Sequence, residues 1–251
     1  MVVVRPALRA AWKGNGMGTI NIQGTRVIDL SQPVEPGIPV PIGFPGPQFQ
    51  TYLAQSKGDI ANVEIMQMSI HTATHCDAPF HFFSALQRVD ELLPDCLIGP
   101  AIVVDLRGKQ GSVGIEESDI ARWEVDTGET IQKDDIVLLH TGHSQHWTTG
   151  EAASGYWKNG WPYLARSAVN YLASKPIRAL GVESFDPDWV NPTDLASAEF
   201  PAHRTFLPKG ILIIENLTNL DQIPSRRCQV IALPLKLKGC SGSPIRVIAV
   251  V

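Results

Sequence analysis

The chain has 251 residues, of which 44% are hydrophobic and 18% are charged. This composition excludes wholesale disorder, and a chain of this length buries a core without disulfides or metal staples. The formal net charge is −4, and Lys and Arg never exceed two in a row, so the sequence does not indicate a nucleic-acid-binding protein. The apolar runs are strand-sized, so no segment is expected to cross a membrane.

The cysteines indicate the redox environment, and the patterning along the chain indicates where the folded domain begins. No two of the four cysteines have the C-x-x-C spacing, so we expect free thiols in a reducing compartment, the cytoplasm. Residues 1–18 carry no strand or helix pattern and are expected to form a disordered N-terminal extension, with Met17 as an alternative start to Met1. Residues 19–251 show no linker and are expected to form a single domain.

The predicted elements are many short strands and few helices. A first strand at residues 25–30 precedes a proline-rich extended loop, and residues 63–70 alternate apolar and polar side chains like a half-buried strand. Helices are expected at 116–123 and 162–175, with an ordered loop at 144–161. The remaining strands are expected at residues 99–106, 136–140, 179–182, 211–214, 228–234 and 245–251. This pattern indicates an α/β or α+β domain with a mixed sheet.

Residues 71–82, with the sequence HTATHCDAPFHF, concentrate groups that bind metals. Imidazole and carboxylate are the usual ligands of Zn²⁺ and Mn²⁺, and His71, His75 and Asp77 converge if the chain bends after His75. Pro79 prevents a helix from continuing through the segment. We therefore expect a strand-end loop that wraps a metal, rather than the helix of an H-E-x-x-H metalloprotease.

This segment resembles the H-x-G-T-H-x-D-x-P-x-H-F signature of the cyclase-type metal-dependent hydrolases, which include bacterial kynurenine formamidases and isatin hydrolases. Ala73 stands where the signature has glycine, so the loop is expected to be tighter here. Residues 183–186 depart from an Asp-containing turn that is common in the family. Further stretches that resemble the family lie at residues 28–33, 44–46, 139–142, 203–217, 233–236 and 242–246.

The resemblance implies a swivelling β/β/α domain that assembles as a homodimer or homotetramer. It implies one or two Zn²⁺ or Mn²⁺ ions per subunit, with Asp77 as the bridge if there are two, and it makes His81 the catalytic acid and base. The metal ligands that it implies are His71, His75, Asp77, His203 and Glu215.

The implied reaction is hydrolysis of a C–N amide bond in a small aromatic or cyclic amide, such as N-formylkynurenine or isatin. A metal lowers the pKa of bound water to about 7, and a histidine such as His81 can move the proton to the leaving nitrogen. The candidate substrate contacts are Phe44, Phe49, Phe82, Trp161 and Ser243. For each aromatic residue the alternative is packing in the core, and for Ser243 it is a structural role in a turn at 242–244.

Several residues have other interpretations. Glu215 could be a solvated strand end, and His203 could neighbour a helix cap. Cys76 is expected to be a packed thiol rather than a soft ligand. The spacing of His140, His143 and His146 favours scattered loop histidines over a second metal site, since three-residue steps fit neither a strand face nor a helix broken by glycine.

Two rival functions remain at this stage. The first is a metal-dependent cyclase or dehydratase of the same fold, which would consume no water. The second is a binding protein without catalysis. His81 together with a full ligand set favours an enzyme, because a binding protein needs no group that moves a proton.

Overall fold

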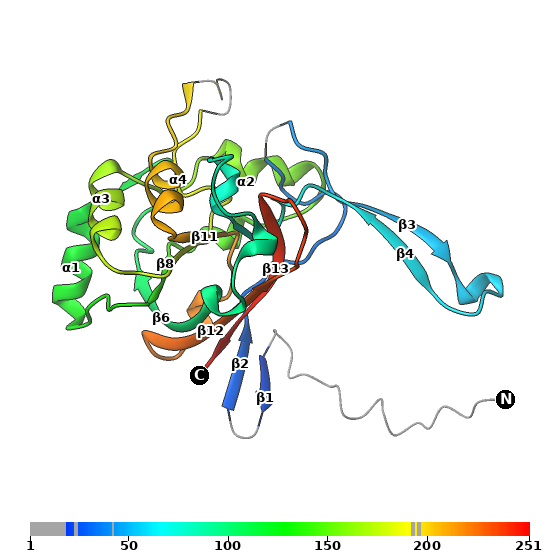
Figure 1. Ribbon diagram of the computed structural model, residues 1–251, viewed down its shortest axis with the longest axis horizontal. Coiled ribbons are helices and arrows are strands. Elements are labelled where there is room, and N and C mark those ends of the chain that lie inside the picture. The colour runs from blue at the N-terminus through cyan, green and yellow to red at the C-terminus, as the bar shows by residue number, and fades with distance from the viewer. Residues whose placement is uncertain (1–18, 23–24, 42, 192–193, 195–196) are drawn as a thin grey trace.

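The computed structural model describes residues 19–22, 25–41, 43–191, 194 and 197–251. The extension expected at residues 1–18 lies outside this part of the chain. From residue 19 onward the elements build around one closed sheet (Figure 1), which confirms the expected mixed sheet and α/β class.

The central sheet has nine strands and closes on itself, because β13 pairs with β5 as well as with β12 and β2. The strands β6, β8, β10 and β11 run parallel to one another, and the remaining pairs are antiparallel. The order in the sheet is β1 (Thr19–Ile22), β2 (Thr25–Asp29), β13 (Gly242–Val250), β12 (Arg227–Pro234), β6 (Ile98–Asp105), β8 (Ile136–His140), β10 (Ala179–Val182), β11 (Leu212–Glu215) and β5 (His75–Asp77).

Both faces of the parallel strands are buried, which is why they appear in the sequence as continuous apolar runs. Because side chains alternate along a strand, Ile136 and Leu138 of β8 point into the sheet's interior core, and Val137 and Leu139 pack on its outer face. The outer face is covered by helices α1 (Glu117–Thr127), α3 (Arg166–Ser174) and α4 (Pro201–Phe206).

The helix boundaries follow local signals. Glu116 and Asp119 form a capping box at the start of α1. The helix continues to Thr127, four residues beyond its predicted end at 123, and Gly128 terminates it with φ 70°. The predicted helix at 162–175 begins only at Arg166, because β9 (Tyr163–Leu164) pairs with β7 (Gly114–Ile115). The loop expected at 144–161 contains a short helix, α2 (Gly155–Lys158).

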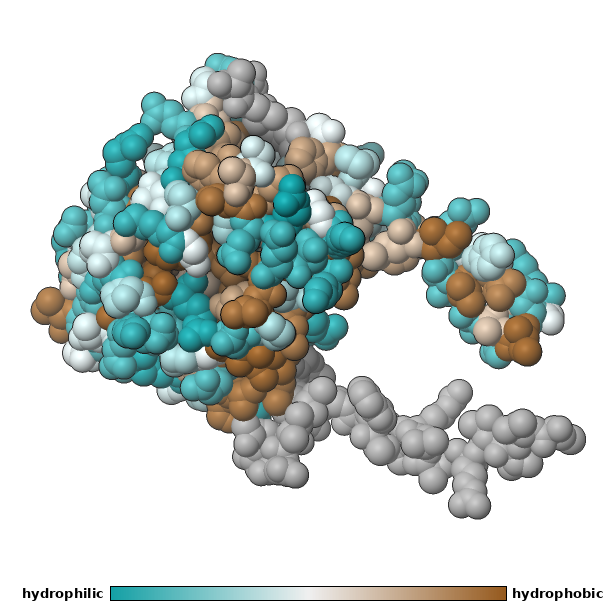
Figure 2. Space-filling model, in the orientation of Figure 1, coloured by the Kyte–Doolittle hydropathy of each residue, from teal (hydrophilic) through white to brown (hydrophobic). Residues whose placement is uncertain are grey.

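A hairpin of β3 (Gln48–Leu53) and β4 (Val63–Gln67) projects from the body (Figure 1), and we call it the arm. Every residue of β4 is exposed, and so is every residue of β3 except Leu53. The strand predicted at 63–70 therefore forms, over Val63–Gln67, but it is exposed rather than half-buried. Paired residues share a face, so Phe49 with Met66 and Gln50 with Ile65 place exposed apolar side chains on both faces. Figure 2 shows hydrophobic surface, in brown, on the projecting arm.

Two expectations from composition can be compared with the structure. All four cysteines are free thiols, as expected. In the part of the chain that the structure describes, no helix has the length and apolar character needed to cross a membrane.

Candidate metal centre and active-site cavity

The five predicted ligands meet at the carboxyl end of the parallel strands. Glu215 is the last residue of β11 and pairs in register with His75, the first residue of β5. Asp77 points to the same face of β5 as His75, because the two residues are two apart. His71 comes from the turn before β5, and His203 comes from α4. All five side chains are buried, with at most 8% of any residue exposed.

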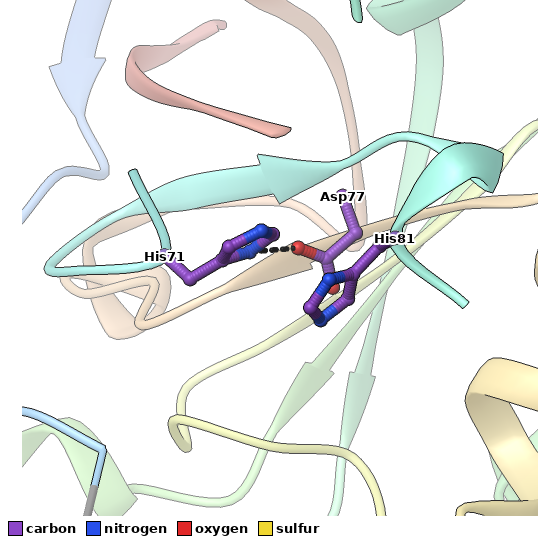
Figure 3. A group of neighbouring side chains, drawn as sticks. All are labelled: His71, Asp77 and His81. Carbon is purple, nitrogen blue, oxygen red and sulfur yellow. Dashed lines mark ion pairs between the residues drawn. The ribbon is translucent and has the colours of Figure 1, made fainter. Parts of the chain in front are cut away.

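Asp77 lies at the centre of this group. Its Oδ1 atom is 2.7 Å from His71 Nδ1 and 3.5 Å from His75 Nε2, and its Oδ2 atom is 3.2 Å from His203 Nε2. Glu215 closes the group from the other side, with Oε2 3.2 Å from His75 Nε2 and Oε1 3.5 Å from His203 Nε2. Figure 3 shows how His71 and Asp77 point toward each other.

The outward nitrogens of two ligand histidines are held by acceptors. His75 Nδ1 donates to the Ala73 carbonyl at 2.9 Å, and His203 Nδ1 donates to Asp188 Oδ2 at 2.8 Å. Each Nδ1 therefore carries a proton, which leaves Nε2, facing the carboxylates, as the nitrogen available to bind an ion. Metal-binding histidines have this arrangement, in which a carbonyl or carboxylate fixes the tautomer.

His71 gives the strongest indication that a cation belongs here. Its Nε2 is 2.8 Å from Ser241 Oγ, so Nδ1 carries the lone pair when Nε2 donates. His71 Nδ1 and Asp77 Oδ1 are both buried without a hydrogen-bond partner, although only 2.7 Å separates them. Two facing acceptors repel unless they share a proton or a metal cation, and the nitrogen and oxygen donors present fit a divalent ion.

The electrostatics of the site support this view. Burial lowers the pKa of His75, but the hydrogen bond and charge of Glu215 and the charge of Asp77 outweigh it and raise this pKa to about 9. Burial also disfavours charged His203, yet hydrogen bonds to Asp188, Asp77 and Glu215 raise its pKa well above the usual range. Without a metal, protons fill the space between the carboxylates, which is where a cation would bind.

His81 lies beside the ligands without being held by a carboxylate. Its ring stacks on the His71 ring, with centroids 3.9 Å apart, and it is one of the residues that line a cavity. Figure 3 shows His81 beside His71 and Asp77. Burial lowers the pKa of His81 to about 4, against the opposing charge of Asp77. This pKa is below the near-neutral value assumed from the sequence, so the imidazole is neutral at pH 7 and has a lone pair to accept a proton.

A cavity of about 220 Å³ opens above the ligands. Its walls are mainly aromatic, and the Phe82 ring stacks on the His203 ring with centroids 4.5 Å apart. The lining residues are Pro41, Phe44, His71, His75, His81, Phe82, Phe185, Asp186, Val190, Phe200, His203 and Glu215.

Among the predicted substrate contacts, Phe44 and Phe82 line this cavity, and the other three do not. Phe49 lies on the arm. Trp161 is fully buried beneath Phe185, and its Nε1 donates to the Asp188 carbonyl. Ser243 is also fully buried, where its hydroxyl accepts from the Leu235 amide. Core packing and a structural role therefore explain Trp161 and Ser243, which corrects the expectation that they line the cavity.

Several residues that line the cavity or support the ligands were not among the predicted site residues: Pro41, Phe185, Asp186, Asp188, Val190 and Phe200. Phe185 and Asp186 follow the carboxyl end of β10, and Phe200 directly precedes α4, so their place near predicted ligands was the available signal. Burial and the charges of Glu215 and Asp188 raise the pKa of Asp186 well above its usual range, despite His203. Asp188 is fully buried, and no motif pointed to it.

The remaining candidates keep their structural interpretations. Cys76 packs in the interior core, because it points to the opposite face of β5 from His75 and Asp77, and burial raises the pKa of its thiol. His143 is buried against the Tyr156 ring, with centroids 4.6 Å apart. Among the described residues, the groups able to hold a metal do not include His140, His143 or His146.

Comparisons with known proteins agree with this geometry. The model of the Cyclase family matches residues 28–189. A kynurenine formamidase from Bacillus thuringiensis is 32% identical over 221 residues, which cover 88% of this chain and 95% of that protein. Isatin hydrolase A from Labrenzia aggregata, solved with benzyl benzoate, superposes with a TM-score of 0.77 at 28% identity and covers 98% of this chain and 99% of its own.

A predicted metal-dependent hydrolase from Bacillus stearothermophilus also superposes, with a TM-score of 0.69 and 28% identity over 90% of this chain and 98% of its own. The family match covers more than half of the chain, and the relatives are matched over nearly their whole length. Together with the buried His, Asp and Glu group, these likenesses show that the chain belongs to the Cyclase family of metal-dependent hydrolases.

Proposed function

We propose that this protein hydrolyses a C–N amide bond in a small aromatic or cyclic amide. The observation that carries the proposal is the position of the buried ligand group and His81 at the floor of an aromatic cavity. His71, His75, Asp77, His203 and Glu215 would hold Zn²⁺ or Mn²⁺. When bound, such an ion supplies an acidified water and an electrophile for the carbonyl oxygen.

The protein's own residues supply the proton transfer. His81 is neutral at pH 7, so it can accept the proton of the attacking water and deliver it to the leaving nitrogen. Asp77 faces His71 and His75 through Oδ1 and His203 through Oδ2, which supports a capacity of up to two ions per subunit.

The cavity walls favour a flat substrate. Phe44, Phe82, Phe185 and Phe200 surround the space above the ligands, and aromatic rings bind well between such side chains. Relatives are named kynurenine formamidase and isatin hydrolase. N-Formylkynurenine and isatin each carry an aromatic ring on the amide nitrogen. An amide of this type, N-formylkynurenine-like or isatin-like, is the substrate class that we propose.

The experiment is a panel of N-formyl aromatic amines and aromatic lactams, assayed with metal-stripped protein and after addition of Zn²⁺ or Mn²⁺. We expect ring-opened or deformylated product only with metal, with one water consumed per amide cleaved. Turnover by stripped protein would contradict metal dependence. Product formed without uptake of oxygen from ¹⁸O-labelled water would favour the cyclase or dehydratase alternative.

We also propose that the chain forms a homodimer or homotetramer through the arm. An isolated two-stranded hairpin is marginally stable in water, yet this one projects from the body and exposes Phe49, Ile65 and Met66. A second copy of the chain would cover both faces. We expect light scattering to give the mass of an oligomer for wild type and of a monomer for the Ile65→Glu and Met66→Lys double variant. A monomeric wild type would contradict this proposal.

A further inference from the structure

Asn216 lies directly behind the metal centre. It follows Glu215 at the end of β11 and is buried, with 3% of the residue exposed. Its Nδ2 donates to the Ala73 carbonyl at 2.9 Å. The same carbonyl accepts the hydrogen bond from His75 Nδ1, also at 2.9 Å. One oxygen therefore connects the Asn216 amide to a metal-ligand ring.

The orientation of this carbonyl decides which nitrogen of His75 faces the ion. A carbonyl oxygen only accepts, so its contact keeps the proton on Nδ1 and leaves the lone pair on Nε2. Nε2, the nitrogen that this leaves to bind an ion, is 3.2 Å from Glu215 Oε2 and 3.5 Å from Asp77 Oδ1. If the carbonyl turned away, neither the tautomer nor the ring orientation would be fixed.

The peptide that bears this carbonyl is strained and needs outside support. Ala73 has φ 55°, a left-handed conformation in which an alanine persists only when its surroundings impose it. Asn216 makes two hydrogen bonds to this segment. Its Nδ2 donates to the Ala73 carbonyl, and its backbone carbonyl accepts from Thr74 Oγ1 at 2.6 Å. The second contact also uses the backbone next to Glu215, so it ties two ligand-bearing strands together.

The direction of the Asn216 amide is itself determined. The Tyr156 hydroxyl lies 3.1 Å from Asn216 Oδ1 and 2.5 Å from the Glu183 carbonyl. Since Ala73 offers only an acceptor, Nδ2 must face it, and Oδ1 faces the hydroxyl of Tyr156. Tyr156 is fully buried, so this arrangement is shielded from water.

We propose that Asn216 is a positioning residue of the metal centre, which fixes the metal-binding tautomer of His75 through the Ala73 carbonyl. The inference rests on the proposed function only in requiring that the site holds a metal. Contacts behind metal-ligating histidines typically change metal affinity by about 10–100-fold, and we expect a loss in this range when the Asn216 amide is removed.

The test is Asn216→Gly, compared with Asn219→Gly. Asn219 is a matched control, because Asn216 with φ 58° and Asn219 with φ 57° are both left-handed. The Asn219 Nδ2 also donates to a backbone carbonyl, that of Asp29, at 2.8 Å. Glycine keeps the left-handed backbone at both positions and removes only the amide. Zinc affinity is measured on stripped protein by competition with a chromophoric chelator, and thermal unfolding is followed without metal.

We expect Asn216→Gly to bind zinc about 10–100-fold more weakly and Asn219→Gly to bind it like wild type. Equal affinity in wild type and Asn216→Gly, or an equal loss in both variants, would overturn the inference. A wild type that binds no zinc would overturn the proposed function first, and the wild-type titration alone reveals that outcome.

A second variant keeps the test decisive if Asn216→Gly does not fold. Asn216→Asp keeps the shape but replaces the donor that faces Ala73 with an acceptor. Its added negative charge would by itself strengthen cation binding, so weaker zinc binding must come from the lost N–H donor. Unchanged or tighter binding by Asn216→Asp would contradict the assignment.

Discussion

Asp77→Asn is expected to abolish zinc binding and amide hydrolysis together. Asp77 is the residue that both sides of the ligand group share: one carboxylate oxygen faces His71 and His75, and the other faces His203. Asparagine keeps the shape and removes the charge, so the three histidines lose the anion around which they are arranged. Mutation of a residue that only supports a ligand typically lowers metal affinity by about 10–100-fold, and we expect the loss of zinc affinity in Asp77→Asn to be larger.

The measurement is zinc per subunit by elemental analysis after dialysis, with kcat/KM on whichever amide the wild type cleaves. Asp135→Asn is a matched control, because Asp135 is equally buried and pairs with Arg227 at 3.1 Å. It lies just before β8, whereas the ligands gather at the carboxyl ends of the parallel strands. The control is expected to unfold at a lower temperature and to keep its zinc. Full zinc occupancy in Asp77→Asn would refute the ligand group described here.

The part of the site that could be predicted from the sequence is the part encoded locally. His71, His75, Asp77 and His81 lie within eleven residues, and the proline at position 79 limits the backbone to a strand-end turn. The buried parallel strands were equally visible, because both of their faces are apolar. Local spacing and periodicity are properties of the chain itself, so they survive folding unchanged.

Contacts between distant segments could not be predicted in this way. A Cβ on Gly242 would lie 2.5 Å from the Cys76 carbonyl and 2.8 Å from the His71 ring, so β13 packs directly under the metal-binding turn. No spacing rule connects position 242 with position 71. The roles of Asp188 and Asn216 were missed for the same reason: each acts on a ligand histidine that comes from another segment.

The errors about aromatic residues have a different origin. The sequence shows that a residue is aromatic, but only packing decides whether its side chain lines the cavity, fills the core or is exposed to solvent. Trp161 fills the core beneath Phe185, Phe49 stands on the arm, and Phe82 reaches the cavity. The arm has the same alternation of apolar and polar residues as a half-buried strand. Periodicity does not reveal whether other parts of the chain cover such a strand.

His81→Ala is expected to separate metal binding from turnover. His81 stacks on His71 but, unlike His75 and His203, is held by no carboxylate in the described hydrogen bonds and ion pairs, so the ligand group stays complete without it. Removing a group that moves the proton costs about 10²–10⁴-fold in rate. We therefore expect zinc content like that of wild type and a kcat lower by this factor.

The control for burial is His143→Ala. His143 is also largely buried, burial lowers its pKa to about 4 as it does for His81, and it lies outside the cavity lining. Single-turnover and steady-state rates on the same amide distinguish the two histidines: His143→Ala is expected to keep its rate, and His81→Ala to lose it. If His81→Ala loses its zinc as well, His81 is a metal ligand. Another group in the cavity must then move the proton, and the titratable carboxyl of Asp186 is the candidate.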